Sequence, residues 1–307
     1  MRIIDQWQGL DEACKGASVA LGNFDGVHLG HQSVIALART NPRHGVITFE
    51  PHPRQFFAPQ APAFRLMNAQ ARAHRLEKLG LTHLYQLPFT QTLAAMSAEA
   101  FATDVLAHGL GVTHVVVGAD FRFGKGRAGT AQTLETLGQS LNFQTTVAPL
   151  LAIDGTEISS TSIRAALTDG RPRDAAKMLG HWHRIEGMVI HGEKRGRTLG
   201  FPTANQSLTG LHLPRFGVYA TRADILTGPY KGTYNAASSL GVRPQYGENL
   251  PNLETFLFDF DGDLYGETLS IALVDYLRPE ATFPSLDTFV AQMHADCARA
   301  RQILTTL

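Results

Sequence analysis

The sequence GNFDGVHLGH at residues 22–31 joins an apolar run at residues 17–24 to a helical pattern near residues 31–40. Its glycines allow the backbone to approach a ligand closely. The helix start presents unpaired N–H groups and the positive end of the helix dipole, which together suit a phosphate group. His28 and His31 stand three residues apart at this start, where imidazoles can stabilise charge that builds on a phosphoryl group. The stretch therefore predicts a strand–turn–helix unit with a phosphate site at the turn.

The same alternation of strand and helix continues to about residue 150. Apolar runs typical of buried strands lie at residues 45–50, 82–87, 112–119 and 142–151. Helical patterns lie between them at residues 64–80, 97–109 and 130–140. This order predicts right-handed βαβ units and a parallel sheet, in which ligands bind at the carboxyl ends of the strands.

The pattern changes near residue 183. From there to about residue 278, short β-like runs follow one another, separated by Gly, Pro and Asn, with no strong helical pattern between them. This predicts a compact antiparallel barrel or sandwich. A final helix is expected at about residues 285–304, and its apolar stripe needs a partner, most simply the barrel. The stripe consists of Leu286, Phe289, Val290, Met293, Cys297 and Leu304, and Ser285 is the expected N-cap. We therefore expect two domains, residues 1–182 and residues 183–307.

The composition excludes several classes of protein. The 307 residues are enough for about two domains. The 27 Lys and Arg balance 27 Asp and Glu, so the chain lacks the overall basic field that nucleic acid or an anionic membrane attracts. Two cysteines, Cys14 and Cys297, argue against a disulfide framework and a structural zinc site. Asp5 interrupts any signal-peptide core, and no apolar run approaches the roughly 20 residues that span a bilayer. We expect a cytoplasmic protein without nucleic-acid or membrane partners.

Two other interpretations of the histidine pair remain open at this point. His28 and His31 have the spacing of metal ligands, but a metal site needs at least a third ligand and no HExxH pattern is present. They could also be ordinary loop residues, which is the default for a lone pair in a chain with 13 histidines. The strand–turn–helix context favours the phosphate site.

The stretch at residues 22–31, in the form GxFDGxHxGH, resembles the HxGH signature of the nucleotidyltransferase superfamily. In its full form it resembles the FMN adenylyltransferase module of prokaryotic bifunctional riboflavin kinase/FAD synthetases. Three further stretches resemble that module in the same order, namely ITFEPHP (47–53), VVGADFRFGKGRAG (116–129) and EISSTSIR (157–164). The resemblance implies a Rossmann-like α/β domain that transfers the adenylyl group of ATP to FMN.

Each of these stretches also has a physical interpretation. Hydroxyls at a helix N-terminus, followed one turn later by Arg164, make a phosphate clamp, whereas simple N-capping would not explain the arginine. The hydroxyls belong to Ser159, Ser160 and Thr161, and the turn at residues 22–31 supplies Gly22, Phe24, Asp25 and Gly26 as nucleotide contacts. The resemblance implies that His28, His31 and Arg164 are catalytic. It places the flavin near His52, Asp120, Phe121 and Phe123, for which a rigid turn and ordinary core packing are the alternatives.

The second half contains a loop rich in glycine and positive charge, GEKRGRTLGFPTAN (192–205). A solvated surface loop is one interpretation, and a P-loop is excluded because GxxxxGK[ST] is absent. Thr203 and Asn205 alternate onto one side of the chain, and their hydroxyl and amide oxygens are hard ligands suited to Mg²⁺ with nucleotide phosphates. The stretch resembles the riboflavin kinase signature, as do LPRFGVYA (213–220), NLETFLFDFDGDLYG (252–266) and YLRPEATF (276–283).

This second resemblance implies that Glu254 is the general base for the 5′-hydroxyl of riboflavin, although an exposed strand glutamate would be the ordinary case. The implied nucleotide contacts are Gly192, Lys194, Arg197, Gly200 and Pro202. Arg278 is either a flavin contact or an ion-pair partner of the C-terminal helix. The chain departs from the usual family pattern at Ser239, where Asn is usual, and at Gln245, where Thr is usual.

The resemblance extends from about residue 15 to residue 304 and implies a bifunctional enzyme. The second module phosphorylates riboflavin to FMN and the first adenylylates FMN to FAD, each with Mg²⁺ and ATP. Flavins are then substrates and products rather than cofactors. The rivals are an enzyme with one decayed module and a non-catalytic flavin- or nucleotide-binding regulator. Such a regulator would more plausibly lack Glu254 or the histidine pair.

Overall fold

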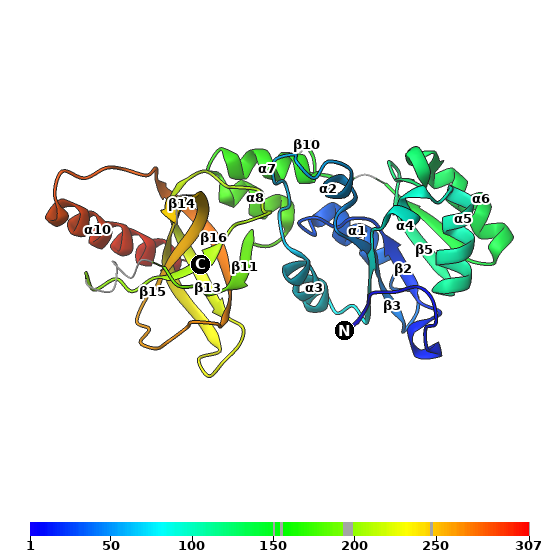
Figure 1. Cartoon of the computed structure of the whole chain (residues 1–307), viewed down its shortest axis with the longest axis horizontal. Coiled ribbons are helices and arrows are strands. Elements are labelled where there is room, and N and C mark those ends of the chain that lie inside the picture. Colours follow the sequence, from blue (N-terminus) through cyan, green and yellow to red (C-terminus); the bar gives the residue numbers. More distant parts are fainter. Residues whose placement is uncertain (150, 154–155, 193–198, 246–247, 307) are drawn as a thin grey trace. The chain divides into compact units, whose positions relative to one another are not determined.

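The computed structural model describes residues 1–149, 151–153, 156–192, 199–245 and 248–306. It divides into two compact units (Figure 1). The first comprises Met1–Pro62 and Arg72–Ser159, and the second comprises Ala63–Ala71 and Ser160–Leu307. Among the described residues, no helix is long and apolar enough to cross a membrane.

The first unit is built on a parallel sheet of six strands in the order β1-β4-β3-β2-β5-β8. The strands are β1 (Arg2–Ile4), β2 (Ser18–Leu21), β3 (His44–Glu50), β4 (His83–Pro88), β5 (His114–Gly118) and β8 (Gln144–Ala148). The helices are α1 (Leu29–Leu37), α2 (Pro53–Phe57), α3 (Ala69–Lys78), α4 (Gln91–Ala95), α5 (Ala98–Ala100) and α6 (Ala131–Leu141), with a π-helical run at Phe101–Gly109. Two small ribbons pair β6 (Arg122–Phe123) with β7 (Gly129–Thr130), and β9 (Ala152–Ile153) with β10 (Thr156–Glu157). The predicted parallel α/β domain is confirmed.

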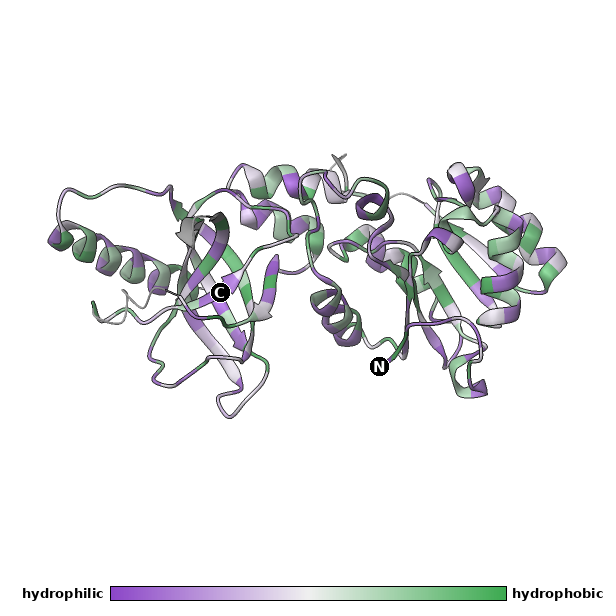
Figure 2. Cartoon of the chain, viewed as in Figure 1, coloured by the Kyte–Doolittle hydropathy of each residue, from purple (hydrophilic) through white to green (hydrophobic). Residues whose placement is uncertain are grey.

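Local sequence explains where most of these elements begin. The strands of the sheet are mostly hydrophobic, while the helices alternate hydrophobic and hydrophilic residues (Figure 2). Ser97 accepts a hydrogen bond from the Ala100 N–H at 3.1 Å, so it is the N-cap that the sequence predicts. The predicted helix at residues 64–80 is wrong in its first turn. Its start moves to Ala69 because the Asn68 side chain accepts from the Ala71 N–H at 2.8 Å, which ends the preceding extended segment.

The second unit is a nearly closed antiparallel barrel with strand order β11-β16-β13-β14-β15-β12. Its strands are β11 (Arg184–Met188), β12 (Ala204–Ser207), β13 (Gly217–Ile225), β14 (Gly232–Gln245), β15 (Glu248–Leu257) and β16 (Thr268–Arg278). A bridge between Ile190 and Asn205 brings the two edges together, which makes the sheet a barrel rather than a sandwich. Helices α7 (Ser160–Thr168) and α8 (Pro172–Leu179) precede it, and α10 (Leu286–Thr305) follows it.

The C-terminal helix α10 covers part of the barrel, as its apolar stripe predicts. Ser285 caps it through a reciprocal pair of hydrogen bonds with Thr288. Only the second half of the stripe is well covered: Ala300 and Leu304 are buried in one cluster with Leu277. Leu286, in the first turn, is 59% exposed, so the predicted stripe extends beyond its packing partner.

His183, just before β11, is buried beside β16, and its carbonyl accepts from the Leu273 N–H at 2.9 Å. Burial, and secondarily the neighbouring His181 and His212, lowers the pKa of His183 to about 3. An unfolded chain takes up this proton near pH 6.5. Between these pH values the unfolded state binds more protons, so stability decreases as the pH falls.

We predict that replacing His183 by Gln flattens the pH dependence of unfolding. Because the buried imidazole of the wild type stays neutral, its free energy of unfolding should be about 2 kcal/mol lower at pH 5 than at pH 7. Denaturant unfolding of the wild type and of His183→Gln at both pH values measures this difference, with the exposed His294→Gln as the control. Equal pH dependence in all three proteins would contradict the assignment.

Candidate active sites

The turn between β2 and α1 is held in an unusual backbone conformation. Phe24, Gly26 and Val27 have φ values of +53°, +87° and +45°, in the left-handed region. This region is unfavourable for bulky and β-branched residues and persists only where the surroundings impose it. Phe24, Asp25 and Val27 are all buried, which supplies that constraint. Such strained turns concentrate at ligand sites.

His28 and His31 lie face to face at the start of α1. Their ring centroids are 3.6 Å apart with an interplanar angle of 17°. His28 is the N-cap, and its Nδ1 accepts from the His31 N–H at 3.2 Å, so the proton of a neutral His28 ring is assigned to Nε2. Burial, and secondarily the charge of His28, holds the pKa of His31 well below its ordinary value. The buried Nδ1 of His31 has no hydrogen-bond partner among the described residues. The His31 ring is therefore neutral at pH 7, and as a neutral imidazole it can offer a hydrogen bond without carrying a charge.

The glycines of this turn make room for its own side chains. A Cβ at Gly30 would lie 3.1 Å from His28 Nδ1, and a Cβ at Gly22 would lie 3.3 Å from the Phe24 ring. The sequence predicts that these glycines admit a ligand, whereas the structure fills the space with the imidazole and the phenyl ring. The Ile158 carbonyl would lie 3.7 Å from a Cβ at Gly30, so the segment that ends in Ser159 reaches this turn.

The next strand end carries His52. The Glu50–Pro51 peptide bond is cis, and His52 is a buried N-cap of α2 whose Nδ1 accepts from the Arg54 N–H at 3.0 Å. As the cap of α2, His52 therefore forms part of a turn, which is the alternative to a flavin contact that the sequence leaves open. Beside it, aromatic rings that the sequence analysis did not single out form a continuous series. Phe56 and Phe57 each lie edge to face with Phe89, at centroid distances of 5.2 and 5.7 Å.

This series of rings continues to the β5–β6 turn. Phe49 contacts both Phe89 and Phe101, and Phe101 contacts Phe123 at 5.9 Å. Phe123 is buried in the core and stacks on the half-buried Phe121 at 5.6 Å, while Asp120 is exposed. Phe123 thus has the core position that was its alternative, and Phe121 is the more accessible ring. Phe57, which is 68% exposed, ends the series at the surface.

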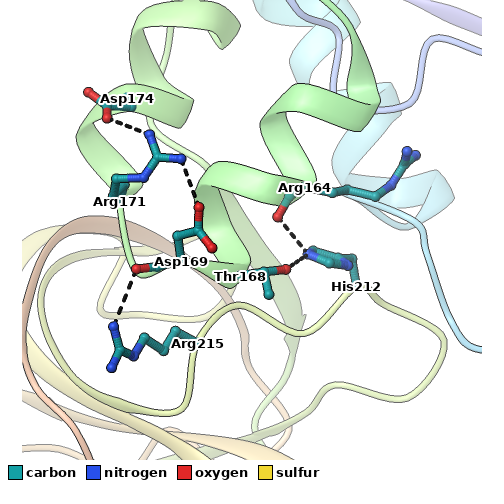
Figure 3. A network of polar contacts seen from close by, with 7 residues as sticks. All are labelled: Arg164, Thr168, Asp169, Arg171, Asp174, His212 and Arg215. Carbon is teal, nitrogen blue, oxygen red and sulfur yellow. Dashed lines mark hydrogen bonds and ion pairs between the residues drawn. The ribbon is translucent and has the colours of Figure 1, made fainter.

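Arg164 lies on α7, in the second unit, together with Ser160 and Thr161, while Ser159 belongs to the first. Its Nε donates to the Phe64 carbonyl at 2.6 Å, and its guanidinium lies 5.4 Å from the Phe64 ring centroid. Figure 3 shows this side chain pointing away from the network that holds α7. In that network His212 Nε2 donates to the Arg164 carbonyl at 3.1 Å, and Asp169 lies beside Arg171 and Arg215. The helix is thereby fixed within its own unit.

The barrel brings together the residues that the sequence predicts for the second site. Asn205 on β12 and Ser239 on β14 both lie directly opposite Glu254 on β15, one on each side. Asn205 is 7% exposed and Glu254 is half-buried, so the carboxylate has access to solvent. Thr203 precedes β12, and its carbonyl accepts from Asn205 Nδ2 at 3.3 Å. The Gln245 side chain lies outside the described part of the structure.

Asn252 is a functional candidate that the sequence analysis missed. Its Nδ2 donates to Asn205 Oδ1 at 3.2 Å and to Glu254 Oε1 at 3.4 Å, so it bridges the two predicted residues. It stands two residues before Glu254, and residues i and i+2 share one face of a strand. That period is the signal that could have identified it.

The loop ahead of β12 is described only at its two ends. A Cβ at Gly192 would come within 2.5 Å of Asn205 Nδ2, so this glycine leaves room for the Asn205 side chain. Gly200 has a φ of +82°, and Pro202 is exposed. Lys194 and Arg197 lie outside the described residues.

A cavity of about 340 Å³ opens beside Thr203, within the size range of small-ligand sites. Its lining includes Val189, Pro202, Thr203, Leu257, Asp261 and Tyr265. The cavity has apolar walls next to a few polar groups, which suits a flat ring system attached to a polar group. Arg278 makes the ion pair that was one of its two predicted roles: Nη2 lies 2.8 Å from Asp296 Oδ2 on α10.

No group of three or more His, Cys, Asp or Glu residues placed to hold a metal ion occurs among the described residues. Among these residues, therefore, none is placed as a third ligand for a metal ion held by His28 and His31. Thr203 and Asn205 offer a hydroxyl and an amide oxygen, which suit a magnesium ion that takes most of its ligands from water and phosphates.

Comparisons with known proteins match a different family to each part of the chain. The model of the FAD synthetase family matches residues 10–162, and the model of the riboflavin kinase family matches residues 179–304. A bifunctional riboflavin kinase/FMN adenylyltransferase of Pseudomonas fluorescens is 37% identical over 99% of this chain and 98% of its own length. A protein of the same description from Bacillus subtilis is 35% identical over 94% of this chain and 93% of its own length. A crystal structure described as a macrolide-efflux protein from Streptococcus pneumoniae has a TM-score of 0.82 and 31% identity, over 97% of this chain and 98% of that one.

We predict that the pKa of the His31 imidazole rises in a His28→Asn variant. Asparagine keeps the N-cap of α1 but removes the neighbouring ring and its charge, which is one of the two causes of the lowered pKa. Burial remains, so the new value should still lie below about 6.5. A titration of the ring signals by NMR measures both values. An unchanged or lower pKa in the variant would contradict the assignment of this lowering to the charge of His28.

Proposed function

Because the chain belongs to the bifunctional riboflavin kinase/FMN adenylyltransferase family, and so phosphorylates riboflavin to FMN and adenylylates FMN to FAD, we propose the residues that carry each step. We assign adenylyl transfer to residues 1–182 and phosphorylation to residues 183–307. The family matches at residues 10–162 and 179–304 support this boundary, although the compact units divide earlier, between Ser159 and Ser160.

In the kinase module, Glu254 is the general base. It accepts the proton of the riboflavin 5′-hydroxyl as that oxygen attacks the γ-phosphorus of ATP and ADP leaves. The observation that carries this assignment is the strand register, which sets Glu254 opposite Asn205 with Asn252 donating to both side chains. Asn252 thereby fixes the carboxylate and the amide in one orientation.

Thr203 and Asn205 are the residues that would hold Mg²⁺ in this module. The Asn205 oxygen that accepts from Asn252 has a second lone pair, so the donor set fits a hard cation. When bound together with ATP, the ion would neutralise part of the negative charge of the phosphates. We place the nucleotide in the cavity beside Thr203 and Pro202, with Gly192, Gly200, Lys194 and Arg197 as its loop contacts. Arg278, which Asp296 orients, is assigned as a contact of the flavin.

In the adenylyltransferase module, a phosphate oxygen of FMN attacks the α-phosphorus of ATP and pyrophosphate leaves. His28 and His31, stacked at the N-terminus of α1, donate hydrogen bonds to the phosphoryl oxygens as charge develops. The turn between β2 and α1 contributes the nucleotide contacts Gly22, Phe24, Asp25 and Gly26. The phosphate clamp at the start of α7 contributes Ser159, Ser160, Thr161 and Arg164. No side chain becomes covalently attached, so catalysis consists of positioning and charge stabilisation.

The flavin of this module is assigned to the aromatic series. Phe121 and the exposed Phe57 offer rings for stacking, and His52 and Asp120 flank them. Phe123 supports Phe121 from the core. We place the protein in the cytoplasm, which its two free cysteines, Cys14 and Cys297, support because thiols stay reduced there.

We predict that Glu254→Gln abolishes FMN formation and leaves FAD formation from supplied FMN unchanged. The amide keeps the shape of the side chain but cannot accept the hydroxyl proton, a loss of about 10²–10⁴-fold. Chromatographic separation of the flavins over time, with riboflavin or FMN as substrate, measures both steps. The matched control is Glu267→Gln, which changes another barrel carboxylate, one that accepts from the Thr227 hydroxyl. Loss of both activities in Glu254→Gln would contradict independent modules.

We predict the converse for His31→Ala, which should slow FAD formation by about 10²-fold while FMN formation continues at the wild-type rate. The alanine removes a hydrogen-bond donor from the developing phosphoryl charge. Steady-state rates with FMN and ATP, compared with rates with riboflavin and ATP, measure the effect. An unchanged rate of FAD formation would remove His31 from the site.

A further inference from the structure

Arg72, on α3, is a buried charge that the assignments above do not use. It is 1% exposed and is among the largest fully buried side chains of the described structure. Arginine is rarely buried so completely unless it is paired. Its Nη2 lies 3.0 Å from Glu50 Oε2 and 3.2 Å from Gln86 Oε1, and its Nη1 lies 3.4 Å from the Asn23 carbonyl.

Two of these partners, Asn23 and Glu50, stand at turns of the adenylyltransferase module, while Gln86 lies on β4. Asn23 directly precedes Phe24, where the strained turn toward His28 and His31 begins. Glu50 ends β3 and directly precedes Pro51 and His52. One guanidinium therefore contacts both turns, and its planar fork of donors can serve several acceptors at once.

The Asn23 carbonyl has a second donor. The hydroxyl of Thr48, which is fully buried on β3, donates to it at 3.2 Å. Arg72 and Thr48 thus approach the same oxygen from a helix and a strand. The two buried donors on this carbonyl fix the peptide plane between Asn23 and Phe24, and the positive-φ turn begins at Phe24.

We propose that Arg72 is a positioning residue for adenylyl transfer, which holds the turn of His28 and His31 and the turn of Pro51 and His52 in their catalytic arrangement. The proposal rests on the assignment of this module's active site, and it adds a residue that does not touch the substrate. Its charge is matched by Glu50, so a neutral replacement removes this ion pair together with the hydrogen bond to the Asn23 carbonyl and releases both turns. A misplacement of about 1 Å at such a site costs up to about 10²-fold in rate.

The test is a double-mutant cycle between Arg72→Met and His31→Ala, read as the kcat of FAD formation from FMN and ATP. If Arg72 acts through the histidine turn, Arg72→Met lowers kcat by about tenfold or more in the wild type but by less than about twofold in His31→Ala. Arg72→Lys, which keeps the charge against Glu50, should restore most of the rate. Thr48→Val, which removes only the hydroxyl donor, should give a smaller loss than Arg72→Met.

Two controls separate positioning from folding. The riboflavin kinase rate of the same preparations should not change, and thermal unfolding should show each variant folded at the assay temperature. Arg43→Lys is the matched arginine: Arg43 donates to the carbonyls of Glu12 and Lys15 at 3.0 Å and contacts neither turn, so FAD formation should be unaffected.

Equal losses from Arg72→Met in both backgrounds would overturn the proposal, because a residue that only stabilises the fold acts additively with His31. A wild-type rate in Arg72→Met would overturn it as well. If His31→Ala itself left FAD formation unchanged, the active-site assignment on which the proposal rests would be wrong.

Discussion

Hydrogen bonding between neighbouring strands is the constraint on which both proposed active sites depend. In the first unit, β2 pairs in parallel with β3 and β5, so the turns that follow these strands meet at one edge of the sheet. Those turns carry the histidine pair, His52 and Phe121. In the second unit, the antiparallel register of β12 and β15 sets Asn205 opposite Glu254. A slip of one residue would turn every side chain of a strand to the other face, so register decides which groups can react.

A chain with no net charge offers ATP no overall attracting field, so we assign phosphate binding to local groups. The N-terminus of α1 offers the positive end of the helix dipole, and burial there lowers the pKa of His31, which stacks on His28. Two ion pairs serve a different purpose: Arg278 with Asp296 joins β16 to α10, and we assign Arg72 with Glu50 to holding the turns of the first site. In both pairs the arginine is neutralised by a carboxylate in direct contact with it.

The sequence predicts the architecture well because its signals are local. The turn at residues 22–31, the cap at Ser97 and the change of pattern near residue 183 each depend on a few adjacent residues. Contacts between distant residues were not predictable in this way. The bridge from Asn252 to Asn205 requires the β12–β15 register, and the burial of Arg72 requires α3 to pack on β3 and β4. The helical pattern at residues 64–80 begins before the helix itself, because Asn68 caps the helix at a residue that the hydrophobic period does not mark. The sequence predicts ligand space at Gly22 and Gly30, whereas in the structure the rings of Phe24 and His28 take up that space.

The central claim is that one chain carries two catalysts with separate residues and a shared flavin, FMN. The most direct test mixes two inactivated chains, Glu254→Gln and His31→Ala, with riboflavin, ATP and Mg²⁺, and follows the flavins over time. The first chain lacks only the kinase base and the second lacks only the adenylyl-transfer imidazole, so the mixture should form FAD although neither chain alone forms it efficiently. A mixture that forms no more FAD than the sum of the two separate chains would contradict the account.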